Sequence, residues 1–144
     1  PHNDAAIRGA FTGIGAETSR DDLTRAVLEG VCFGLRDSAE ALASVGARPE
    51  ALLAIGGGSG SRYWLRLLAT VLNVPLRLPR AGEFGAALGA ARLGRVAATG
   101  EDPREVMLPP ATGEVIEPLA DLTAAFDDAY QRFGPAYRGI KSVQ

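Results

Sequence analysis

The fold is decided by one stretch, Leu52-Leu53-Ala54-Ile55-Gly56-Gly57-Gly58-Ser59-Gly60-Ser61, which leads directly into the helix-like segment 62–73. A short apolar run that ends in consecutive glycines and opens into a helix predicts a strand, a turn and a helix in succession. Backbone N–H groups in such a turn can approach an anion at the positive end of the helix dipole. We therefore expect the turn to contact the phosphates or the nucleoside of a nucleotide.

The glycine spacing excludes the two commonest phosphate-binding motifs. No Gly-Lys-Ser/Thr follows the turn, so it is not a P-loop. It is not an ordinary dinucleotide fingerprint either, because Ser61 stands where a G-x-G-x-x-G motif counted from Gly56 needs its third glycine. The alternative to ligand binding is a tight turn that uses its glycines only for positive φ angles.

Composition limits the class of protein. The chain has 144 residues, of which 47% are hydrophobic, and 15 basic against 17 acidic residues give it a net charge of −2. These values fit one folded domain and offer no electrostatic case for binding nucleic acid or an anionic membrane surface. Cys32 is the only cysteine, and no apolar run approaches the roughly 20 residues of a membrane span, so we expect a cytoplasmic protein.

Several kinds of chemical site have no counterpart in the sequence. His2 is the only histidine, and neither H-E-x-x-H, C-x-x-C nor an EF-hand loop occurs. A zinc site made by this chain alone and a Ser-His-Asp triad are thereby excluded. We assign no catalytic residue and no metal ligand within the chain.

Hydrophobic periodicity predicts strands that alternate with helices. We expect strands at residues 9–14, 51–55 and 74–78, and helices that begin at Ser19 and that cover residues 62–73 and 81–98. Ser19 followed by Asp22 is typical of a helix start. Gly30 and Gly34 each cost about 1 kcal/mol relative to alanine inside a helix, so another element is expected to pass close to them.

Each predicted helix has its own pattern of residues. The first helix is expected to bury Leu23, Ala26, Val27, Val31, Leu35, Ser38, Ala39 and Leu42, and to leave Arg25, Glu29, Arg36 and Glu40 in water. The second is predicted from the apolar residues Tyr63, Trp64, Leu67, Leu68 and Leu72. The small-residue run 85–91 is expected to let the third pack tightly on a neighbour.

The last third of the chain has a different composition. Residues 99–118 are rich in proline, glycine and charge, which predicts an irregular crossing. A final helix follows, with Leu119, Leu122, Phe126, Tyr130 and Phe133 on one face. These aromatic residues could pack within the chain, which we favour, or anchor a homodimer.

The order of elements predicts an α/β layered domain with mostly parallel central strands. Three strands are fewer than such sheets usually have, so we expect further strands to precede Pro1. Residues 1–98 are expected to form the body of the lobe, and residues 99–144 to pack on it.

Four stretches carry a resemblance to the C-terminal lobe of FGGY-family carbohydrate kinases, most closely to the xylulokinases among them. They are Pro1-His2-Asn3-Asp4 with Arg8-Gly9-Ala10-Phe11; Gly9-x-Phe11-x-Gly13-Ile14, seven residues, and Asp22-Leu23-x-x-Ala26-Val27-Leu28-Glu29; Ile55-Gly56-Gly57-Gly58-Ser59-x-Ser61-x-x-Trp64; and Gly85-Ala86-Ala87-Leu88-Gly89-Ala90-Ala91-Arg92-Leu93. Together they span essentially the whole chain.

The resemblance implies an actin-like, ribonuclease H-like fold of two lobes that close over ATP, Mg²⁺ and a sugar. Gly57 and Gly58 would contact the phosphate and sugar part of the nucleotide through backbone N–H groups. Ser59, Ser61 and Arg62 would border the adenosine, although relatives commonly have asparagine at the position of Arg62.

The family's catalytic aspartate, its sugar-binding residues and its Thr/Gly phosphate segment would all lie before Pro1. The resemblance therefore implies a nucleotide-binding lobe that is inactive alone, with D-xylulose as the expected substrate of the whole enzyme and Mg²⁺ held by the phosphates and the other lobe. Two alternatives stay open: a kinase for ribulose, gluconate or glycerol, and a free-standing module that binds nucleotide without catalysis.

Overall fold

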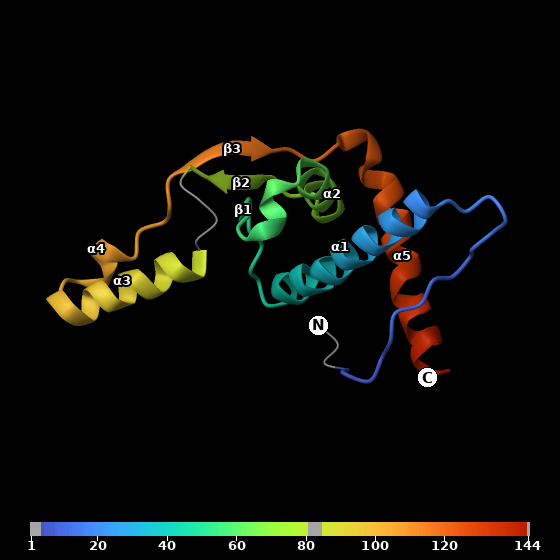
Figure 1. The fold of residues 1–144 in the computed structure, drawn as a ribbon, viewed down its shortest axis with the longest axis horizontal. Helices are drawn as coiled ribbons and strands as arrows, with labels where there is room; N and C mark the ends of the chain where they lie inside the picture. The colour runs from blue at the N-terminus through green and yellow to red at the C-terminus, as the bar shows by residue number, and fades with distance from the viewer. Residues whose placement is uncertain (1–3, 81–84, 144) are drawn as a thin grey trace.

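The computed structural model describes residues 4–80 and 85–143. Its elements, shown in Figure 1, are α1 (Arg20–Ser44), β1 (Leu52–Leu53), the 3₁₀ turn η1 (Gly57–Gly60), α2 (Arg62–Leu72), β2 (Leu76–Pro79), α3 (Gly85–Thr99), α4 (Pro103–Val106), β3 (Thr112–Ile116) and α5 (Ala120–Lys141). Among them, no helix is long and apolar enough to cross a membrane.

The strands form one sheet in the order β1-β2-β3. β1 is parallel to β2, with Leu52 opposite Leu76, so the predicted strand–turn–helix–strand unit around the glycine turn is confirmed. β3 is antiparallel to β2, with Ile116 opposite Leu76. The sheet is therefore mixed rather than mostly parallel.

Two predictions about strands were wrong. Residues 9–14 form no strand, because no other strand in the described structure lies beside them and their side chains are all exposed. Residues 99–118 contain α4 and β3 in place of an irregular crossing. The β-branched residues Thr112, Val115 and Ile116 favour a strand, but the surrounding proline, glycine and charge hid that signal.

The start of α1 confirms the prediction at Ser19. The Ser19 hydroxyl accepts a hydrogen bond from the backbone N–H of Asp22 at 3.2 Å, and an Asp22 carboxylate oxygen accepts one from the Ser19 N–H at 3.0 Å. This is a capping box, which satisfies N–H groups that have no partner inside the helix. The predicted start of α3 at Ala81 lies outside the described residues.

The predicted buried face of α1 was wrong. The buried residues are Cys32 and Phe33, whereas Val27, Val31, Leu35 and Leu42 are all at least 43% exposed. The helix turns its other side to α2 and α5, and Val27 and Val31 line a hollow of about 740 Å³ together with residues 7–12 and the last turns of α5. Nothing in the described part of the chain passes close to Gly30 or Gly34, since a Cβ at either would meet no atom within 4 Å.

Helix α2 lies between two hydrophobic clusters. Leu67 and Val71 join Cys32, Phe33 and Phe126 in a cluster with α1 and α5. On the sheet side, a second cluster consists of Leu65, Ala69, Leu76 and Ile116. Of the apolar residues that predicted α2, Leu67 is buried and Tyr63 is 55% exposed.

Helix α5 packs on α1 through its aromatic residues. The ring of Phe33 lies 6.0 Å from that of Tyr130 and 5.5 Å from that of Phe133, measured between centroids. Arg36 lies 4.3 Å from the Tyr130 ring centroid and forms an ion pair with Asp127 at 2.6 Å. Both tail aromatics thus contribute to the core of the chain, and Figure 1 shows α5 crossing α1, far from α3 and α4.

Candidate nucleotide-binding turn

The glycine turn connects the sheet to the start of α2. Gly56 has φ 91°, and the four residues Gly57–Gly60 then form the 3₁₀ turn η1. The Ser59 hydroxyl donates to the Gly56 carbonyl at 2.7 Å, and the Ser61 hydroxyl accepts from the Trp64 N–H at 3.3 Å, which caps α2. Both serine side chains therefore hold the shape of the turn.

The glycines of the turn have different reasons to be glycine. Gly56 needs its positive φ. A Cβ at Gly58 would lie 3.3 Å from Nε1 of the Trp64 indole, so a larger residue would press on that ring. A Cβ at Gly57 or Gly60 would meet nothing within 4 Å, and neither has a positive φ. A tight turn that needs glycine only for its positive φ angles therefore does not account for Gly57 and Gly60, and the space where their side chains would lie is open.

Backbone donors are available on this open side. As first residues of a helical turn, Gly57 and Gly58 carry N–H groups that the turn itself cannot satisfy. The positive end of the α2 dipole adjoins the turn, because Ser61 caps that helix and Arg62 begins it. The first turn of α2 contains no acidic residue. The arrangement suits an anionic group.

Arg62 forms an ion pair with a residue that the sequence did not mark as functional. Its guanidinium forms an ion pair with Glu114 of β3 at 2.5 Å, and the two side chains are 54% and 50% exposed. Glu114 lies in the segment that was predicted to be irregular, and no motif marks it. Only the pairing of β3 with the sheet brings it to the turn.

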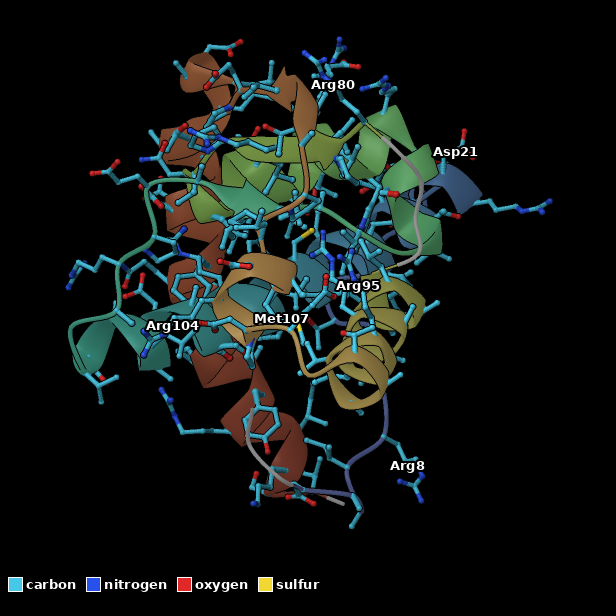
Figure 2. The ribbon with its side chains drawn as sticks, turned by 90° about the vertical axis from the view of Figure 1, so that its left-hand side faces the viewer. Arg8, Asp21, Arg80, Arg95, Arg104 and Met107 are labelled. Atoms are coloured by element: carbon cyan, nitrogen blue, oxygen red, sulfur yellow. The ribbon has the colours of Figure 1, made fainter. Side chains whose placement is uncertain are left out.

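A hollow of about 360 Å³ lies beside the start of α2. Its walls are Tyr63 and the first two turns of α1, namely Asp21, Asp22, Thr24, Arg25 and Leu28. Figure 2 labels Asp21, which lies in the first turn of α1 and forms part of the wall of this hollow. The sequence did not indicate this hollow, because it forms only where the start of α1 lies beside Tyr63 of α2.

Two charged groups of the hollow, Asp22 and Arg25, have partners in α1 or its N-cap. Hydrogen bonds from Ser19 hold the pKa of the Asp22 carboxyl below its usual value. The hydrogen bond to Glu29 raises the pKa of Arg25. Over residues 4–80 and 85–143, no group of three or more His, Cys, Asp or Glu side chains could hold a metal ion.

Comparison with known proteins shows the family of the chain. The model of the C-terminal domain of the FGGY family of carbohydrate kinases matches residues 1–98. The chain belongs to this family. It is 35% identical to the xylulose kinase of Escherichia coli K12 over 141 residues, which are 97% of the chain and 29% of that protein.

Solved structures of the family share the fold. The xyloylose kinase of Brucella ovis superposes with a TM-score of 0.89 and 52% identity, over 100% of this chain and 30% of that one. The gluconate kinase of Lactobacillus acidophilus gives 0.74 and 30% identity, over 97% and 28%. The expected α/β fold of an actin-like kinase lobe is confirmed, and the chain spans less than a third of these relatives' length.

Proposed function

We propose that the chain is the nucleotide-binding C-terminal lobe of a sugar kinase that transfers the γ-phosphate of ATP to a hydroxyl of a ketopentose, with D-xylulose as the favoured substrate. The observation that carries the proposal is the turn at the start of α2, where Gly57 and Gly60 are open without any conformational need for glycine. The similarity to xylulose kinases over nearly the whole chain supports the choice of sugar.

In this proposal the turn binds the nucleotide through its backbone. The N–H groups of Gly57 and Gly58 donate to the phosphate and sugar side of the nucleotide. Ser59 and Ser61 border the adenosine while their hydroxyls keep the turn rigid, and Arg62 lies at its rim. Phosphoryl transfer depends on positioning and on stabilising the charge that develops on the transferred group, and fixed N–H donors contribute to both.

The remaining parts of the enzyme lie outside this chain. The base that accepts the proton of the sugar hydroxyl and the sugar pocket belong to the other lobe, so the chain alone is expected to be inactive. Mg²⁺ would be held by the phosphates and that lobe. The half-exposed stripe Val27, Val31, Leu35 and Leu42 supports this division, because apolar surface of this kind is usually covered by another part of a protein.

A matched pair of glycine variants tests the nucleotide assignment in the full-length polypeptide that carries this chain. Gly57→Ala adds a methyl group on the open side of the turn, and Gly89→Ala adds one in α3, where a Cβ also meets nothing within 4 Å. Losing one hydrogen bond to a charged phosphate costs about 1.5–3 kcal/mol, so Gly57→Ala should raise KM for ATP at least about tenfold. Gly89→Ala should leave it unchanged, and equal values for both variants would contradict the proposal.

The substrate is tested separately with D-xylulose, L-ribulose, gluconate and glycerol. Gluconate and glycerol kinases are also among the relatives, which keeps those sugars as candidates. Activity on glycerol alone would reject the ketopentose. ATP binding without transfer to any of the four would favour a non-catalytic nucleotide-binding module.

A further inference from the structure

Strand β3 and helix α2 meet in a regular register beside the turn. Ile116 packs in one cluster with Leu65 on the sheet side of α2. Two residues earlier on the strand is Glu114, and three residues earlier on the helix is Arg62. Residues two apart on a strand and three apart on a helix lie on the same face. The Arg62–Glu114 ion pair therefore extends the contact between α2 and β3 that Leu65 and Ile116 make.

The same stretch of chain is anchored to α2 at a second point. The backbone N–H of Leu119 donates to the hydroxyl of Thr70 at 3.0 Å, and Thr70 is 1% exposed. This hydrogen bond near the end of α2 is made by a buried side chain. The anchor at Arg62 is half-exposed, and it acts on the residue that directly follows the Ser61 cap.

The position of Arg62 gives the ion pair an electrostatic role. A cation in the first helical turn is repelled by the positive end of the helix dipole, and the first turn of α2 contains no carboxylate of its own. Glu114 supplies the missing negative charge from a neighbouring strand. Without it, the Arg62 side chain would be free to swing toward any anion near the turn.

We infer that Glu114 is a positioning residue for the nucleotide-binding turn. Its ion pair with Arg62 fixes the start of α2, so that the N–H groups of the turn face the nucleotide, and Arg62 acts through Glu114 rather than by its own contact with the base. This inference rests on the proposed function. The inference also gives Glu114, which lies beyond the residues 1–98 that the family model matches, a role in the site.

A charge reversal separates positioning from direct contact in the full-length polypeptide. Glu114→Gln and Arg62→Gln should each raise KM for ATP about threefold, the size expected for an ion pair this exposed, with KM for the sugar and kcat unchanged. The double variant Arg62→Glu with Glu114→Arg restores the pair in reverse. It should return KM for ATP to within about twofold of the wild-type value.

The control is Glu101→Gln, which breaks an exposed ion pair with Arg95 at 2.5 Å on α3 and should leave KM for ATP unchanged. Thermal melting of every variant shows whether the fold is retained. If Arg62 bound the nucleotide itself, the reversed pair would be the most impaired variant, and that result would overturn the inference. A wild-type protein that binds no ATP would instead reject the proposed function.

Discussion

Replacing Thr70 by valine should loosen the attachment of α5 at one identifiable hydrogen bond. Thr70 is buried, its hydroxyl donates to the Arg66 carbonyl at 2.7 Å, and it accepts from the Leu119 N–H at 3.0 Å. Valine keeps the shape and removes both bonds. The Arg66 carbonyl retains the helical hydrogen bond from residue 70, so the main loss is the acceptor of Leu119, a cost of about 1–2 kcal/mol.

Amide hydrogen exchange at Leu119, followed by NMR in the full-length polypeptide, measures this loss directly. A cost of 1–2 kcal/mol corresponds to exchange about 5- to 30-fold faster. Thr70→Ser is the control, because it keeps the hydroxyl and loses only a methyl group, about 1 kcal/mol of packing. If the Leu119 amide exchanged as slowly in Thr70→Val as in Thr70→Ser, the hydrogen bond would contribute nothing and the reasoning would be refuted.

Three further predictions concern the core and α1. Leu65→Ala should cost about 2–5 kcal/mol in the free energy of unfolding, read from a urea titration, because Leu65 is 1% exposed in the cluster below the sheet. Ser19→Ala should cost about 1 kcal/mol in the same titration. Since Ser19 holds the folded pKa of Asp22 below 3.8, this difference from wild type should be full above pH 3.8 and shrink as the pH falls further. Burial raises the pKa of the Cys32 thiol to about 12. It should therefore not react with a disulfide reagent in the folded protein at pH 8, whereas ionisation of the unfolded thiol should weaken folding progressively between pH 9 and 12.

The unit around the turn was predictable because its signals are local. The apolar run, the consecutive glycines and the helical spacing that follows them each act within a few residues, and they predicted β1, the turn and α2. The start of α1 was predictable for the same reason, since Ser19 and Asp22 satisfy each other's backbone. Local chemistry of this kind does not depend on what else the chain packs against.

The misassigned elements depend on distant partners. Both sides of α1 carry apolar residues, and periodicity alone favoured the side with Val27 and Val31 over the side with Cys32 and Phe33. Which side of α1 is buried depends on where α2 and α5 pack, and the sequence did not indicate their positions. Glu114 was missed in the same way, because a charge in a segment rich in proline and glycine gains meaning only when β3 pairs with β2.

The position of α2 constrains how the site can work. The helix is buried on two sides, through Leu67 and Val71 toward α1 and α5, and through Leu65 and Ala69 toward the sheet. Close-packed cores resist small shifts, so the body of α2 is held by its packing, and the Arg62–Glu114 ion pair acts on the first turn ahead of it. If the chain is the nucleotide-binding lobe that we propose, α2 acts as a fixed platform, and closure around ATP is made by the other lobe moving toward it.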